Sequence, residues 1–90
     1  IQIVKDVKNT ENGFYAVIGV HSDVAKRDEF LRKAVAAGES NIDFFFDVAT
    51  SKYYIYYQKF NDIQSARNAM ELKGSKPYNG NMSLIKIENE

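Results

Sequence analysis

Hydrophobic and polar residues alternate along four short stretches of this chain, and two longer stretches carry apolar residues at helical spacing. Alternation with a period of two is typical of half-buried strands. It predicts strands over residues 14–21, 41–49, 51–60 and 82–88. Apolar residues three or four positions apart predict helices over residues 23–37 and 62–73, each preceded by capping residue types and followed by a glycine.

The first 13 residues give a weaker signal. Residues 1–7 alternate only in part, and a polar cluster of Asn, Thr and Gly follows over residues 8–13. We therefore expect residues 1–13 to be a lead-in or linker and residues 14–90 to form the domain.

The order of these elements is β-α-β-β-α-β. It predicts an α+β fold of the ferredoxin-like (split βαβ) type, in which two helices cover one face of a four-stranded antiparallel sheet. The side chains expected beneath the helices are Ile18, Phe30, Phe44, Ile55, Tyr57 and Ala66. The opposite face of the sheet is expected to stay open.

One strand, SKYYIYYQKF (residues 51–60), carries tyrosines on both of its faces. Because Tyr53, Ile55 and Tyr57 suit the helix-covered face, the other row is expected to form an exposed aromatic platform. Neighbouring strands should extend this platform. The candidate binding residues are Tyr15, Val17, Phe45, Tyr54, Tyr56 and Gln58. Burial against a missing part of a larger parent protein is the alternative explanation, and the start at Ile1 suits such a parent.

Composition and charge narrow the function classes. A length of 90 residues, with 44% hydrophobic and 27% charged residues, fits one folded globular domain and not a disordered tail. Twelve basic residues balance twelve acidic ones, so no overall field favours nucleic acid. An aromatic platform also occurs in RNA-recognition domains, but the glycines of their third-strand pattern are missing here. Without a long apolar run, the domain itself is not expected to insert into a membrane.

Candidate catalytic and metal-binding residues are few. The chain has no cysteine and a single histidine, His21, with no second soft ligand at metal spacing. Asp43 and Asp47 share one strand face but stand about 13 Å apart, too far to share a proton. No nucleophile motif or phosphate-binding loop is present. We therefore expect neither enzymatic activity nor a metal or other cofactor.

Two blocks of the sequence resemble the SPOR (sporulation-related repeat) domain family. The first is FYAVIGVHS followed by a helix that ends at Gly38, and the second is YYIYYQKFNDIQSARNAM. Residues that match the family pattern are Tyr15, Ile18, Gly19, Tyr57, Phe60 and Ala66. The run YYIYYQKFND, the Asn79-Gly80 pair and the ending Ile85-Lys86-Ile87 are similar to SPOR-like domains of Bacteroidota type IX secretion and gliding outer-membrane proteins (PorP/SprF-type).

The resemblance implies a ligand and a location. It implies a periplasmic module, attached to an outer-membrane protein, that binds peptidoglycan glycan strands through the open sheet face. The family's first-strand glutamine corresponds to Val17, so the polar contacts would come from Tyr54, Tyr56 and Gln58. An envelope protein of the secretion or gliding apparatus, docking on the same face, is the alternative partner.

Overall fold

The computed structural model of this chain describes residues 1–73 and 82–90. The described part contains five strands: β1 (Gln2–Lys5), β2 (Gly13–His21), β3 (Asp43–Asp47), β4 (Lys52–Phe60) and β5 (Ser83–Glu88). Two helices complete it, α1 (Val24–Ala36) and α2 (Ile63–Lys73). Gly74, the glycine that follows the second predicted helix, and the Asn79-Gly80 pair lie outside the described residues.

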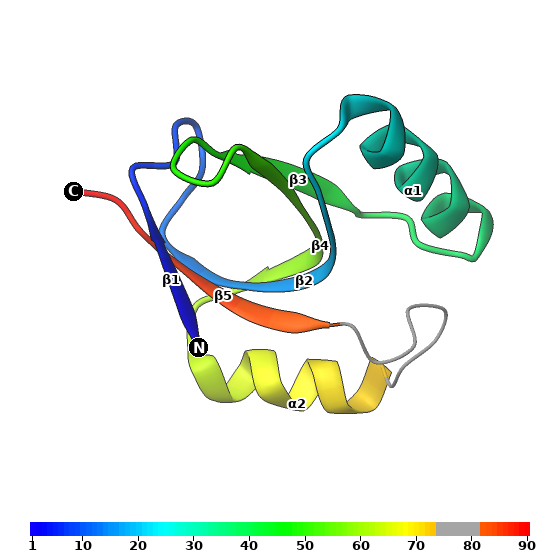
Figure 1. Cartoon of the computed structure of the whole chain (residues 1–90). Coiled ribbons are helices and arrows are strands. Elements are labelled where there is room, and N and C mark those ends of the chain that lie inside the picture. Colours follow the sequence, from blue (N-terminus) through cyan, green and yellow to red (C-terminus); the bar gives the residue numbers. More distant parts are fainter. Residues whose placement is uncertain (74–81) are drawn as a thin grey trace.

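All five strands join one sheet in the order β1-β5-β2-β4-β3. The β1–β5 pair is parallel and the other three pairs are antiparallel. The sheet curls strongly into a half-barrel, which Figure 1 shows end-on. The predicted fold class is therefore wrong: the sheet is mixed, has five strands, and is not the open four-stranded antiparallel sheet of a ferredoxin-like fold. The SPOR resemblance also implies a ferredoxin-like fold.

The curl is associated with irregular pairing between the two central strands. The register between β2 and β4 shifts on both sides of Val17, so that Val17 lies opposite Tyr56 while Ala16 lies opposite Gln58. An extra residue in one strand bends it and increases its twist. The shift also moves Gln58 to the outer face of the sheet, opposite Ala16, and puts Lys59 opposite Tyr15.

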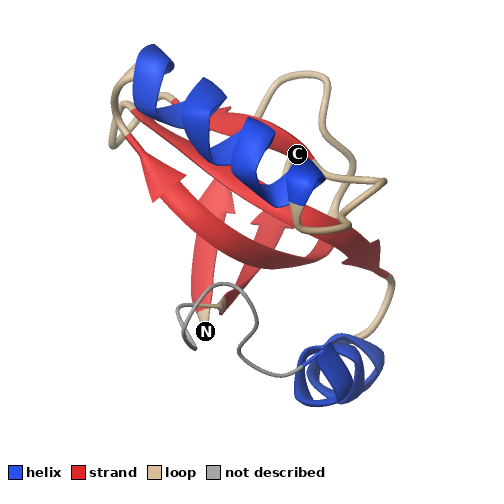
Figure 2. Cartoon of the chain, turned by 90° about the vertical axis from the view of Figure 1, so that its right-hand side faces the viewer, coloured by secondary structure: helices blue, strands red, loops and turns tan. Residues whose placement is uncertain are grey.

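The curled sheet separates two hydrophobic cores. The outer core lies between the sheet and the helices, which both lie outside the curl (Figures 1 and 2). Its members are Ile18, Ala34 and Ile55, with Phe30, Leu31, Ile42, Phe44, Tyr57 and Met82 packed against them. The inner core fills the concave side of the half-barrel with Val4, Val7, Tyr15, Val17, Phe45, Tyr54, Ile85 and Ile87.

The N-terminal segment closes the inner core. The first 13 residues, expected to be a lead-in, instead supply β1 and two side chains of that core, Val4 and Val7. Asn89 holds the segment in place, since it accepts a hydrogen bond from the Val7 N–H (2.7 Å) and donates to the carbonyls of Val7 (3.0 Å) and Thr10 (2.7 Å). The two ends of the chain are thereby joined across the sheet.

Candidate functional site

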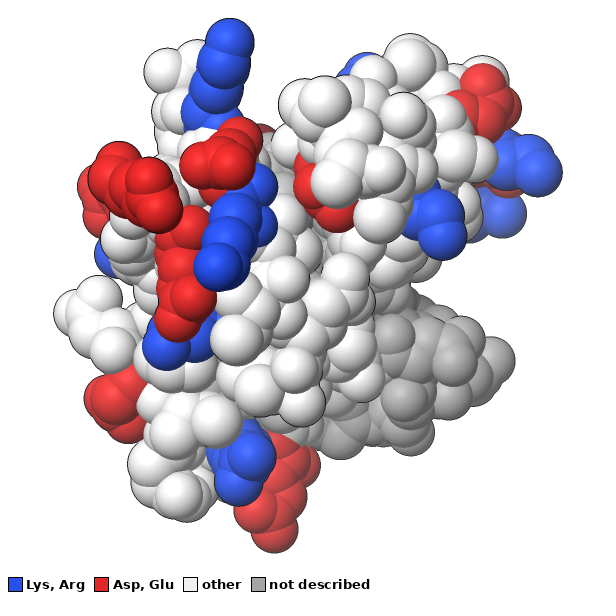
Figure 3. Space-filling view, turned by 60° about the vertical axis from the view of Figure 1, so that its left-hand side comes forward, with Lys and Arg blue, Asp and Glu red and all other residues white. Residues whose placement is uncertain are grey.

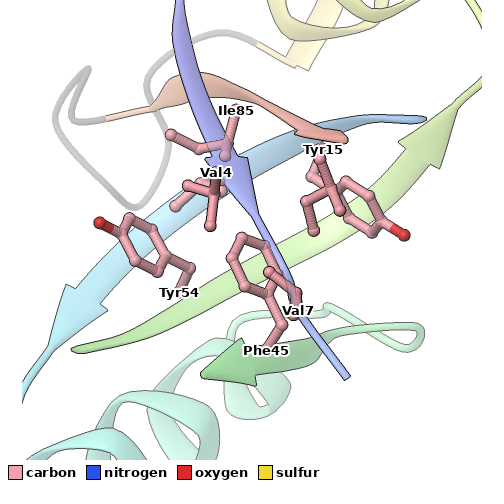
Figure 4. Close-up of a cluster of buried hydrophobic side chains, with 8 residues drawn as sticks. Val4, Val7, Tyr15, Phe45, Tyr54 and Ile85 are labelled. Carbon is pink, nitrogen blue, oxygen red and sulfur yellow. The ribbon is translucent and has the colours of Figure 1, made fainter. Parts of the chain in front are cut away.

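The residues expected to form an open platform lie mostly in the inner core. Tyr15, Val17, Phe45 and Tyr54 are only 2%, 0%, 3% and 4% exposed. In Figure 4, Tyr15, Phe45 and Tyr54 lie around Val4 of β1. Tyr56 is half-buried and packs against this core, and Gln58 is exposed on the outer face. The expected open aromatic face is therefore absent, because the curl and the N-terminal segment cover it.

The inner aromatics contact one another closely. Phe45 stacks on Tyr54, with ring centroids 5.1 Å apart and an interplanar angle of 11°. Tyr15 meets Tyr56 edge-on at 4.7 Å. Offset stacking and edge-to-face contacts are the favourable arrangements of aromatic rings. The ring surfaces that a ligand would contact are therefore already used in packing against one another.

The phenolic oxygens at the ends of this core also have partners. The Tyr54 hydroxyl accepts a hydrogen bond from Gln2 Nε2 at 3.2 Å, and the Tyr15 hydroxyl donates to the Glu11 carbonyl at 2.6 Å. Burial, together with the nearby Tyr56 and Glu11, raises the pKa of Tyr15 to about 12. Burial, followed by the charge of Asp43, raises the pKa of Tyr56. Both tyrosines are therefore neutral near pH 7.

The accessible hollow on this side of the molecule runs between residues 8–11 and the edge strand β3, and we call it the β3 groove. Two adjoining cavities of about 310 and 350 Å³ form it. They share Asn9, Thr10 and Phe44 as walls. The first cavity is also lined by Glu11, Tyr15, Asp43, Tyr56 and Lys59, and the second by Lys8, Phe45, Phe46 and Val48.

The two ends of the β3 groove differ in chemistry. The Asp43 end is polar, and there Lys59 forms an ion pair with Glu11 at 2.8 Å. The opposite end is apolar, because Phe46 is 38% exposed and Val48 is 73% exposed. The groove thus offers carboxylate, amide and hydroxyl groups at one end and apolar contact area at the other.

The backbone along the groove belongs to a sheet edge. Among the described strands, β3 pairs only with β4, and the Phe44 N–H donates to the Asp43 carboxylate at 2.8 Å. Because backbone groups of alternate residues point to the same side of an antiparallel strand, Phe44 and Phe46 direct theirs to the free edge. Such groups can pair with an added strand.

Asp47, which the strand alternation places on the same polar face as Asp43, has a structural role. Only 5% of its surface is exposed, and its carboxylate accepts hydrogen bonds from the Ala49 N–H (3.2 Å) and the Thr50 hydroxyl (2.8 Å). These bonds hold the turn between β3 and β4. The Asp-to-Thr spacing of three residues is a turn signal that sequence reasoning could have used.

Sequence reasoning missed the groove. The alternation over residues 41–49 puts Phe46 and Val48 in the same row as Phe44, which is expected beneath the helices, and Lys8 falls in the expected lead-in. The one available signal was the position of Val48 beside the polar turn at residues 49–51, where an apolar side chain has little to pack against. The approach of residues 8–11 to β3 had no local signal.

Other chemistry is sparse in the described residues. Residues 1–73 and 82–90 hold no grouping of three or more His, Cys, Asp or Glu side chains that could bind a metal ion. Among the described helices, none combines the length and the apolar character needed to cross a membrane. On the face shown in Figure 3, positive and negative side chains are interspersed and neither sign dominates.

No protein-family model, no curated protein and no solved structure matches this chain. The SPOR resemblance therefore stays a prediction, and the feature that points to a function is the geometry of the β3 groove.

Proposed function

We propose that this chain is a non-enzymatic binding domain and that a protein partner docks along the β3 groove. The observation that carries this proposal is the edge strand β3, whose outward backbone groups lie beside the exposed side chains of Phe46 and Val48. Strand addition at a sheet edge uses main-chain hydrogen bonds for affinity and side-chain pockets for specificity. The groove offers both elements.

A glycan ligand is the second candidate, and the polar cavity of the groove favours it. Asn9, Thr10 and Asp43 offer amide, hydroxyl and carboxylate groups beside the half-buried ring of Tyr56. Sugars need hydrogen-bonding groups next to aromatic surface. Peptidoglycan would then bind at the groove and not on the Tyr54 row, whose rings are occupied by packing. The periplasmic location and the attachment to an outer-membrane protein, implied by the SPOR resemblance, stay predictions.

The two candidates can be separated with defined probes. The first measurement is an NMR titration of the ¹⁵N-labelled domain with a soluble peptide whose centre alternates Thr and Val. Strand addition predicts amide shift changes confined to residues 8–10 and 44–48. The second measurement is co-sedimentation with purified sacculi, before and after removal of the stem peptides.

A matched pair of variants provides the control. Val48→Ser changes the groove, while Val35→Ser changes another exposed valine, on α1, that is 59% exposed against 73% for Val48. Weaker peptide binding by Val48→Ser alone supports protein docking. Peptide shifts outside the groove, or no shifts at millimolar peptide, contradict it. Sedimentation with sacculi that is lost in Asn9→Ala supports the glycan candidate instead.

A further inference from the structure

Building on the proposed function, we propose that the β3 groove recognises an extended peptide segment that carries a basic residue at one end, an acidic residue at the other and an apolar side chain between them. The basic residue would meet Asp43 and the acidic residue would meet Lys8. If the groove is not a docking site at all, this inference fails with it. If the groove binds peptides without regard to charge, only the inference fails.

The charges at the two ends of the groove carry this proposal. Asp43 lines the polar cavity and Lys8 lines the apolar one. Both residues are exposed, and neither forms an ion pair with another of the described residues. Glu11 and Lys59, by contrast, already satisfy each other in the same groove. One free charge of each sign therefore remains, and a complementary partner must carry the two opposite charges.

The spacing of these ends sets the length of the segment. Lys8 lies in the cavity that contains Phe46 and Val48, while Asp43 lies five positions before Val48. With a rise of about 3.3 Å per residue, the groove spans about 16 Å along β3. An extended segment of about five residues covers this length. The apolar side chain at its centre then lies near Phe46.

The hydrogen bond between Asp43 and Phe44 couples charge recognition to strand pairing. In the free domain the Asp43 carboxylate occupies the outward Phe44 N–H and so protects the edge. A basic side chain that binds Asp43 draws the carboxylate away from this N–H. The N–H then becomes available to a carbonyl of the incoming strand.

The carboxylates of Asp43 and Asp47 argue against a second copy of this chain as the occupant of the groove. A symmetric antiparallel pairing of two β3 strands centred on Phe45 would place Asp43 opposite Asp47 of the copy. Like charges directly opposite each other destabilise a strand pair. The segment that suits this edge is therefore one of different sequence, with charge of both signs.

The test uses four soluble peptides with the same Thr-Val-Thr centre and different flanking charges. Two carry one Lys and one Glu in either order, one carries two Lys, and one carries two Glu. Affinities are measured at low salt from the amide shifts of residues 8–10 and 44–48. At least one Lys/Glu peptide should bind about two- to five-fold more tightly than either single-sign peptide, and high salt should remove this preference.

Single charge reversals should change the preferred peptide in a defined way. Asp43→Lys is expected to prefer the peptide with two Glu, and Lys8→Glu the peptide with two Lys. Asp23→Lys and Lys26→Glu make the same net charge changes away from the groove and should keep the original preference. Equal binding of all four peptides to the groove overturns the charge proposal while protein docking stands. No change at any groove amide overturns both.

Discussion

Replacing Tyr54 by Ala should remove a large part of the free energy of unfolding of this domain. The ring is 4% exposed, stacks on Phe45 at 5.1 Å and lies beneath the N-terminal segment, where Gln2 donates to its hydroxyl. Removing a buried aromatic side chain costs about 3 to 5 kcal/mol, because both the transfer free energy and the contacts around the new cavity are lost. The total free energy of unfolding of a chain of this length is about 5 to 13 kcal/mol.

The same site offers a graded control. Tyr54→Phe keeps the ring and removes only the hydroxyl, so it should cost about 0.5 to 1.5 kcal/mol for the lost bond to Gln2. Val48→Ala changes a side chain that is 73% exposed and should stay within about 0.5 kcal/mol of the original protein. From most to least stable, the expected order of the variants is therefore Val48→Ala, Tyr54→Phe and Tyr54→Ala.

Urea unfolding followed by fluorescence or circular dichroism measures this order. With a slope of about 2 kcal/mol per molar urea, Tyr54→Ala should lower the unfolding midpoint by about 1.5 to 2.5 M. A platform open to water would give a change of about 0.5 kcal/mol or less. If Tyr54→Ala unfolds at the same midpoint as Val48→Ala, the inner core does not exist in solution and the closed half-barrel is refuted.

Three further outcomes are expected. Gly19→Ala should destabilise the fold by about 1 to 3 kcal/mol, because the new Cβ would lie 2.8 Å from the Phe30 ring. In a double-mutant denaturation experiment, adding Phe30→Leu should recover part of this loss. Burial raises the pKa of Tyr15 to about 12 from 10.0, so its neutral hydroxyl stabilises the fold below pH 10, and this contribution is lost as the pH rises through 12. The difference in unfolding free energy between the original protein and Tyr15→Phe should therefore narrow from pH 10 to pH 12. A difference that stays constant over this range would contradict the burial of the Tyr15 hydroxyl. Hydrogen bonds from the Ser65 N–H and hydroxyl hold the pKa of Asp62 below its usual value, so Asp62→Ala should lower the melting temperature at pH 7. The effect should shrink as the pH falls below about 4, where Asp62 becomes protonated first in the unfolded chain and then, at lower pH, in the folded one.

Local pattern determined much of the secondary structure. Period-two alternation located β2, β3, β4 and β5, and helical spacing with capping residues located α1 and α2. The pattern also assigned Ile55 and Tyr57 to the helix-covered side and Tyr54 to the opposite side. These features follow from short-range geometry, because side chains alternate along a strand and recur every three to four residues along a helix.

The sequence pattern could not decide whether the Tyr54 side faces water. Residues 2–5 pair with residues 85–88 at the far end of the chain, and a four-residue strand with partial alternation gives little local signal of that pairing. The register shift beside Val17 also has no signal in the sequence pattern, since a bulge leaves the composition of the strand unchanged. It nevertheless moved Gln58 off the face that carries Tyr56.

Only the tertiary structure therefore decided the candidate site. Strand curl and the N-terminal segment turned the aromatic row into a second core, and they left the exposed apolar surface at Phe46 and Val48, beside the free edge of β3. An aromatic row suits a ligand platform and a buried core equally well, because both need large apolar side chains on one face of a strand. The difference lies in contacts between segments distant in the sequence, which a local pattern does not contain.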